Sequence, residues 1–344
     1  MPDKAEYKPH YIVLRFSALG DVAMVLSQLR RVAEAMPDAS FTLVARPFMA
    51  TMTEFAPLGN LSAYPFKPEQ DGSVRGLLAL ALRLHKLYPR AVIVDLHDVL
   101  RTKVLRCAFR ILGHKVVSLQ KPRAERKRLF SRPEQSAKVP RELYIYPMVY
   151  RYFDTLKRAT GIALQTETDP LPKIDKKSKY LIGLAPYAQH KGKMLPSETI
   201  RGLLKLLTDE GRYEIVLYGA PGKETEQNAL LASEFANVRL TKAGKLIEEI
   251  EEIASLDLMI SMDSANMHLA SLAETPVLSL WGATHVAAGF LGYRQREEDA
   301  LGIDLTCRPC SAYGQKPCRR EDYPCLNISP EMIYKKVVEL TPVH

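Results

Sequence analysis

Strand-like and helix-like runs alternate along both halves of this sequence, and this alternation constrains the fold more than any other feature. The apolar run 11–16 breaks at a turn of small residues, and helical spacing follows over 21–36. The pattern restarts at 180–184, after a proline-containing segment, 165–177, that shows no periodicity. We therefore predict two doubly wound α/β domains with parallel sheets, joined by a linker and separated by a cleft.

The remaining runs support the same division. Further strands are predicted at residues 41–45, 91–94, 115–119, 213–217, 258–261 and 276–280. Further helices are predicted at residues 74–88, 99–112, 142–161, 197–209, 223–235, 245–255 and 265–273. With about 150 residues per domain, 344 residues correspond to two domains. We place them at 1–165 and 178–330, followed by a C-terminal helix in 331–344.

The net charge of +9 is concentrated in one segment. Residues 101–141 hold 13 Lys and Arg but only two Asp and Glu, a local net charge of +11. Within them, 121–141 combines many charges with three prolines, which predicts a mobile basic loop. Such a local patch favours one anionic docking site over a general nucleic-acid coat. The sequence has no apolar run of about 18 residues, and its polar start lacks the core of a secretory signal, so we expect a cytoplasmic protein.

Five loops that follow predicted strands carry the candidate functional residues, because ligands of α/β sheets bind beyond the carboxyl ends of the strands. The turn 17–21 places Asp21 at a helix start, where it is either a residue favoured by the helix dipole or a general base. The loop 185–196 holds Lys191 and Lys193 just before a helix. These lysines either bind a diphosphate or belong to a solvated basic loop.

The other three loops follow later strands. The loop 219–226 offers Glu224 and Glu226, either for ribose hydroxyls or for an acidic capping turn. In the loop 261–270, Asp263 and Ser264 can cap a helix whose free N–H groups face a bound phosphate. His268, one turn into that helix, is either packed or functional. The loop 281–285 closes the same edge.

Four motifs, in this order, resemble those of the bacterial heptosyltransferases of glycosyltransferase family 9, which build the inner core of lipopolysaccharide. They are RFSALGDV (15–22), HKGKMLP (190–196), SMDSANMHLA (261–270) and SLWGAT (279–284). The resemblance covers about residues 11–338. It implies the GT-B architecture, two Rossmann-like domains facing across a cleft, with the acceptor in the N-terminal domain and the nucleotide-sugar donor in the C-terminal domain.

The resemblance also implies roles for residues of this chain. Asp21 matches the proposed catalytic base, in a loop whose Ser17 we assign to the acceptor. Residues matching the donor site are Lys191, Lys193, Glu226, Asp263, Ser264 and His268. Ala265 stands where the family pattern has glycine. The expected reaction is one inverting displacement, without cofactor or metal, that moves a heptose or related sugar from a nucleotide diphosphate donor, ADP-heptose above all.

The basic segment then acquires a use in binding the acceptor. A lipid A–core acceptor carries phosphates and acidic sugars at the cytoplasmic face of the inner membrane. We expect a peripheral contact there, with five basic side chains that hold the anionic groups. These side chains are Lys121, Arg123, Arg126, Lys127 and Arg128.

Four of the five cysteines crowd into 307–325, with one pair in a C-x-x-C spacing. They are Cys307, Cys310, Cys318 and Cys325. Four thiolates with this spacing suit a structural zinc, and the alternative is a set of reduced structural thiols.

Two other classes of function compete with the glycosyltransferase. A nucleotide-sugar 2-epimerase shares the two-domain architecture but needs no basic acceptor loop. A nucleic-acid binder would use the patch 101–141 for salt-dependent phosphate contacts. That patch has little aromatic interleaving, with Phe109 and Phe130 as its aromatic residues, so we expect no nucleic-acid partner.

Overall fold

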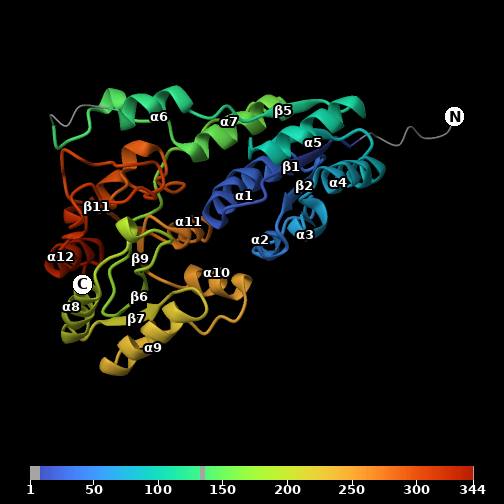
Figure 1. Cartoon of the computed structure of the whole chain (residues 1–344). Coiled ribbons are helices and arrows are strands. Elements are labelled where there is room, and N and C mark those ends of the chain that lie inside the picture. Colours follow the sequence, from blue (N-terminus) through green and yellow to red (C-terminus); the bar gives the residue numbers. More distant parts are fainter. Residues whose placement is uncertain (1–7, 132–135, 344) are drawn as a thin grey trace. The chain divides into compact units, whose positions relative to one another are not determined.

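The computed structural model describes residues 8–131 and 136–343 (Figure 1). Its contacts divide the chain into two compact units. The first comprises Met1–Lys121 and Met148–Glu167, and the second comprises Pro122–Pro147 and Thr168–His344. Each unit is built around its own parallel sheet, as the alternating pattern predicts.

The sheet of the first unit has the order β3-β2-β1-β4-β5, and all its strands are parallel. The strands are β1 His10–Leu14, β2 Ser40–Ala45, β3 Leu61–Pro65, β4 Val92–Asp95 and β5 Val116–Ser118. Helices α4 (Val74–Leu87) and α5 (Leu100–Ile111) contact each other and bury apolar side chains against one face of this sheet. Right-handed crossovers place α1 (Leu19–Glu34) on the opposite face, where it packs against α7 (Met148–Thr160). Short helical segments at Pro47–Ala50 (α2), Thr51–Glu54 and Pro68–Asp71 (α3) complete the unit.

The sheet of the second unit has the order β11-β10-β9-β6-β7-β8, again parallel throughout. Its strands are β6 Tyr180–Ala185, β7 Tyr213–Leu217, β8 Val238–Leu240, β9 Leu258–Met262, β10 Val277–Trp281 and β11 Ala300–Gly302. Its helices are α6 Arg123–Phe130, α8 Ser197–Asp209, α9 Lys223–Glu234, α10 Leu246–Ala254, α11 Ala265–Leu272 and α12 Pro330–Leu340. The C-terminal α12 packs against α8, so it belongs to this unit.

Three strands lie outside the predicted set, and each is the edge strand of its sheet. These strands are β3, β8 and β11. Their residues are mostly half-buried or exposed, because an edge strand has a neighbour on one side only. They therefore lack the continuous apolar run by which a central strand is recognised.

The prediction of a loop over 121–141 is wrong for 123–130, which form α6. Leu129 is buried, and this one apolar anchor holds a helix whose other side chains are mostly polar. The next predicted helix, 142–161, starts later, at Met148, because Pro147 disfavours helical backbone in the residue before it. The segment 122–147 therefore contacts the second unit rather than the first.

Among the helices of residues 8–131 and 136–343, none combines the length and the apolar character needed to cross a bilayer.

Candidate active site

In the first unit, the carboxylate of Asp21 is held from two sides at the carboxyl edge of the sheet. Asp21 lies in the first turn of α1, directly after β1. Its Oδ2 is 2.5 Å from Nη2 of Arg15, and its Oδ1 accepts a 2.9 Å hydrogen bond from the hydroxyl of Tyr152. The Arg15 side chain is 7% exposed and that of Asp21 is 21% exposed. The carboxylate of Asp21 is thus the more exposed member of this ion pair.

The loop after β4 is the neighbour of this turn, because β4 pairs with β1. Arg15 joins the two loops, since its Nη1 donates to the carbonyl oxygen of Leu96 at 2.8 Å. Buried Asp95 shapes the loop: its Oδ1 accepts the backbone N–H groups of His97 and Asp98 at 2.9 and 3.0 Å. The loop after β4 is thereby fixed beside Asp21.

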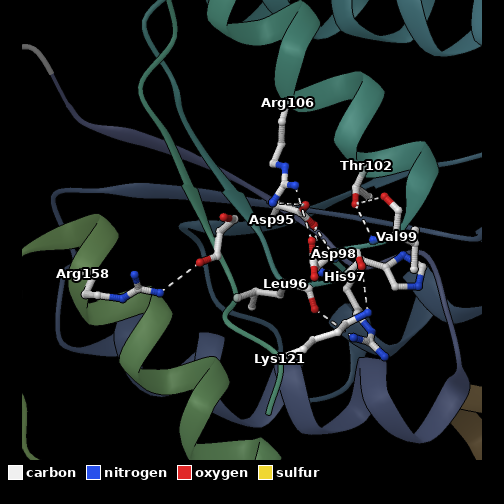
Figure 2. Close-up of polar contacts among 11 residues, drawn as sticks. Asp95, Leu96, His97, Asp98, Val99, Thr102, Arg106, Lys121 and Arg158 are labelled. Carbon is white, nitrogen blue, oxygen red and sulfur yellow. Dashed lines mark hydrogen bonds and ion pairs between the residues drawn. The ribbon is translucent and has the colours of Figure 1, made fainter. Parts of the chain in front are cut away.

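Arg106, Thr102 and Lys121 also hold the loop after β4 in place (Figure 2). The guanidinium of Arg106 lies 3.5 Å from Asp95 and 3.4 Å from Asp98. Thr102 exchanges 3.0 Å hydrogen bonds with the backbone of Val99 and so caps α5. Lys121 donates to the carbonyl oxygen of Asp98 at 2.9 Å, which places this sequence-predicted residue at the Asp21 edge.

His97 is a site residue that the sequence reasoning missed. Its ring meets Phe16 edge-on, with centroids 5.5 Å apart. Burial and the positive charges of Arg15 and Lys121 lower its pKa to about 3, while the charge of Asp21 acts in the opposite direction. The imidazole is therefore neutral near pH 7, with one donor and one acceptor nitrogen. Its position just after a buried strand was the available signal.

In the second unit, three loops that follow neighbouring strands converge on Asp263. Nζ of Lys193, in the loop after β6, is 3.0 Å from Oδ2 of Asp263, which follows β9. The hydroxyl of Thr284, after β10, donates to the same oxygen at 2.7 Å. The Asp263 side chain is 7% exposed and that of Lys193 is 14% exposed. The arrangement fixes an ammonium group at the carboxyl edge of this sheet.

Close backbone contacts hold these loops together. The carbonyl oxygen of Gly192 accepts the N–H of Ala283 at 2.7 Å, and a Cβ on Gly282 would lie 2.3 Å from that same oxygen. Gly314 packs on the aliphatic stem of Lys193, where a Cβ would approach within 2.7 Å. A side chain at Gly282 would therefore displace the loop that carries Lys193, and one at Gly314 would displace the Lys193 side chain.

A buried arginine fastens the loop after β10 to the following segment. Arg308 donates to the backbone carbonyl oxygens of Trp281, Thr284 and Ile303 at 2.8–2.9 Å. Burial lowers its pKa to about 10, so the guanidinium remains charged at neutral pH. Because its donors satisfy three carbonyl groups, Arg308 acts as a structural clamp.

The start of α11 differs in one respect from the prediction. Ser264 occupies the N-cap position, but its side chain makes no capping hydrogen bond. Oδ2 of Asp263, the residue before the N-cap, is bound by Lys193 and Thr284. His268 lies on α11 and is 6% exposed. The helix start is also tied to α10, where Asn266 donates to Glu249 at 2.9 Å.

The other predicted donor residues have contacts that involve neither Lys193 nor Asp263. Lys191 is exposed, with its Nζ 5.1 Å from the ring centroid of Tyr323. Glu224 accepts the N–H of Ala220 at 2.7 Å, so it serves the turn that starts α9. Glu226 is exposed on the first turn of that helix.

The predicted acceptor residues of the basic segment divide into two groups. Arg126 lies over the rings of Phe290 and Tyr313, with its Cζ 5.3 and 5.4 Å from the ring centroids, and it donates to the Tyr313 hydroxyl at 3.0 Å. These contacts pack α6 on the rest of the second unit, and a role of Arg126 in binding the acceptor stays a prediction. Arg123, Lys127 and Arg128 are exposed on the same helix. Ser17 is half-buried in the turn before Asp21.

The zinc interpretation of the cysteines is not supported. In the part of the chain that the structure describes, no group of three or more His, Cys, Asp or Glu is placed to hold a metal ion. Cys310 donates to the backbone carbonyl oxygen of Cys307 at 3.3 Å, and Cys325 packs against Ala283 and Leu326. Burial is the main cause that raises the pKa of the Cys310 thiol. Burial also raises the pKa of Cys325 to about 11, so that thiol stays protonated at neutral pH. Cys318 is likewise a free thiol.

Sequence comparison finds two matches. The model of glycosyltransferase family 9 (heptosyltransferase) matches residues 123–319. Lipopolysaccharide heptosyltransferase 1 of Pseudomonas aeruginosa is 28% identical over 115 residues, which are 33% of this chain. That match spans 32%, about a third, of the relative's own length.

Solved structures resemble the whole chain. E. coli heptosyltransferase WaaC with ADP-2-deoxy-2-fluoro heptose has a TM-score of 0.65 at 17% identity, covering 96% of this chain and 99% of that one. A family 9 glycosyltransferase of Veillonella parvula reaches 0.68 at 18% identity, covering 97% and 98%. E. coli ADP-heptose lps heptosyltransferase II reaches 0.65 at 20% identity, covering 96% and 98%. These likenesses confirm the predicted GT-B fold.

Proposed function

Because this chain belongs to glycosyltransferase family 9, the heptosyltransferases, we propose that it transfers a heptose from ADP-heptose to the inner core of a lipopolysaccharide precursor. One observation carries the proposal: each sheet presents one half of the required chemistry at its carboxyl edge. The first unit presents a held carboxylate, Asp21, and the second presents a held ammonium, Lys193.

The donor is assigned to the C-terminal domain predicted from the sequence, residues 178–330, which lies within the second unit. A diphosphate needs cations and free N–H groups, and Lys193 lies in the same loop cluster as the start of α11. Asp263 positions the ammonium of Lys193, while Ser264 and His268 belong to the helix that faces the phosphates. Lys191 and Glu226 extend the donor site, the latter towards the ribose. The choice of ADP is supported by the WaaC structure, whose ligand is an ADP sugar.

The acceptor is assigned to the N-terminal domain predicted from the sequence, residues 1–165. Its hydroxyl approaches Asp21, beside Ser17 and the neutral imidazole of His97. Lys121 adds a positive charge at the same edge, and exposed Arg123, Lys127 and Arg128 supply further charge for acceptor phosphates. The enzyme acts in the cytoplasm, in peripheral contact with the membrane that carries the lipid A–core acceptor.

The chemistry is a single displacement with inversion at the anomeric carbon. Asp21 takes the proton of the acceptor hydroxyl, whose oxygen forms the new glycosidic bond. The bond between the anomeric carbon and the diphosphate oxygen breaks at the same time. Lys193 stabilises the charge that develops on the departing ADP. Arg15 and Tyr152 keep the carboxylate oriented throughout.

The decisive experiment combines nucleotide selectivity with product stereochemistry. ADP at 100 times its dissociation constant adds about 2.7 kcal/mol to the free energy of unfolding. At roughly 2–4 °C per kcal/mol, this raises the melting temperature by about 5–10 °C, and Lys193→Ala abolishes the shift. UDP, GDP and CMP give smaller shifts. NMR of the product from ADP-heptose and a core acceptor shows an inverted anomeric centre.

Two results contradict the proposal. A melting shift that is selective for UDP would assign a different donor class to the same fold. A product that retains the anomeric configuration of the donor would contradict the single displacement and the role of Asp21 as its base.

A further inference from the structure

Helices α4 and α5 of the first unit expose aliphatic side chains on their outer faces. On α4, Val74, Leu78 and Leu82 recur every fourth residue and are exposed. On α5, Leu100 is 78% exposed and Ile111 is 87% exposed. Single exposed aliphatic residues are common, but a stripe along two neighbouring helices marks an interaction surface.

The stripes are not the core faces of these helices. The buried side of α4 carries Leu77, Leu80 and Leu84, which pack on the sheet. On α5 the buried residues include Leu105 and Phe109, which pack in the same cluster. Both helices cover one face of the sheet and contact each other, so their exposed sides belong to one outer layer (Figure 1).

The charge of this layer has one sign. Neither α4 nor α5 contains Asp or Glu. Arg75 and Lys86 on α4, and Lys103 and Arg110 on α5, are exposed and form no ion pair within residues 8–131 and 136–343. Arg106 of α5 differs, because it is bound by the carboxylates of the loop after β4.

We infer that this surface, Val74–Leu87 together with Leu100–Ile111, lies on an anionic lipid bilayer. A helix with an apolar stripe and a basic polar face binds in the interfacial plane, with aliphatic side chains at the acyl boundary and Lys and Arg at the headgroup phosphates. Each Lys or Arg near such a surface strengthens partitioning about fivefold. A second copy of the chain is disfavoured as the occupant, since it would bring the same positive charges face to face.

The position of the surface suits a lipid-linked acceptor. The N-termini of α4 and α5 follow the carboxyl ends of β3 and β4, at the edge where Asp21 and His97 lie. A bilayer under these helices therefore presents its headgroups towards the Asp21 edge. This link to the acceptor rests on the proposed function, whereas binding to the bilayer itself does not.

The test is vesicle cosedimentation of the full-length protein. One set of vesicles contains phosphatidylethanolamine and phosphatidylglycerol, and the other contains phosphatidylcholine alone. We expect the wild type to bind the anionic vesicles at least tenfold more tightly, and high salt to weaken that binding. The double variants Leu78→Glu/Leu82→Glu and Lys103→Glu/Arg110→Glu each lose at least about tenfold. Leu230→Glu, an exposed leucine on α9, is the matched control and binds like the wild type.

Separate readouts distinguish the two proposals. Melting temperatures show that each variant is folded, and turnover of a water-soluble, deacylated acceptor stays at the wild-type level. Equal binding to both vesicle types, or unchanged binding of the double variants, overturns the bilayer surface. So does a wild type that binds neither vesicle but forms a dimer that Leu78→Glu/Leu82→Glu dissociates. If the wild type does not turn over the deacylated acceptor, that result counts against the proposed function alone.

Discussion

The two units present ion pairs at equivalent edges of their sheets, but with opposite partners exposed. In the first unit the cation, Arg15, is the more buried member at 7% exposure, and Asp21 is the more open at 21%. In the second unit the anion, Asp263, is buried at 7%, and Lys193 is more open at 14%. In the proposed reaction, this difference leaves a carboxylate accessible for proton transfer in one unit and an ammonium accessible to the anionic leaving group in the other.

The largest expected effect follows from Asp21→Asn, which removes the presented charge of the first unit but keeps the side-chain shape. Turnover should fall about 10²–10⁴-fold, because a positioned general base contributes that factor. ADP affinity, measured by calorimetry, should stay unchanged. Glu34→Gln, at the exposed end of the same helix, is the control and should turn over like the wild type. Equal losses of turnover and of ADP affinity would show that the first unit does not act separately.

The second largest effect concerns the buried member of the other pair, Asp263→Asn. Removing a charge that is hydrogen-bonded and nearly buried should lower the free energy of unfolding by about 1.5–3 kcal/mol, measured by denaturant titration. ADP affinity should fall by less than it does in Lys193→Ala. Asp209→Asn breaks an exposed ion pair with Lys205 and should change stability by less than about 0.5 kcal/mol. A gain in ADP affinity would instead show that Asp263 repels the diphosphate.

The stability of the first unit should depend on pH through His97. Its pKa is about 3 in the folded protein, below the usual 6.5, so the unfolded chain binds more protons between these values. Stability therefore falls as pH drops below 6.5. We expect a loss of about 1.6 kcal/mol between pH 6.5 and 5. Thermal denaturation of His97→Gln should lack this part of the loss, and an unchanged pH dependence would contradict it.

The smallest effect is expected for Tyr152→Phe, which removes one hydrogen bond to Asp21 and leaves the ion pair with Arg15. Because the ion pair with Arg15 still holds the carboxylate, we expect the transition state to lose only about 0.5–1.5 kcal/mol of stabilisation, so kcat should fall about twofold to tenfold. Calorimetry should show that the variant binds ADP with the same affinity as the wild type. A loss as large as that of Asp21→Asn would mean that Tyr152 itself contacts the acceptor.

Sequence reasoning reached the parts of the molecule that local pattern determines. Central strands and the turns that follow them were predicted correctly, and the candidates Asp21, Lys193 and Asp263 were singled out because they lie in or next to those turns. Asp21 meets Tyr152 across 131 residues, and no local pattern encodes that pairing. The contacts of Arg126 were not foreseen for the same reason: its aromatic partners, Phe290 and Tyr313, are distant in sequence.

The edge strands were lost for a different physical reason. A strand with one neighbour buries little, so β8 and β11 carry no apolar run. The same holds for His97, whose environment comes from Arg15 and Lys121 rather than from its own neighbours in the chain. Sequence patterns record burial, whereas these features arise from charges and contacts that the tertiary fold brings together.

The segment 122–147 gives the chain an unusual route. The polypeptide passes from one unit to the other at 121–122, returns at 147–148 and leaves again at 167–168. Cutting after residue 165 would therefore not release an intact half: the N-terminal fragment would keep α6 but lose the two aromatic rings that Arg126 contacts. Independent expression of the first unit would call for splicing out 122–147 and joining β5 to α7 directly.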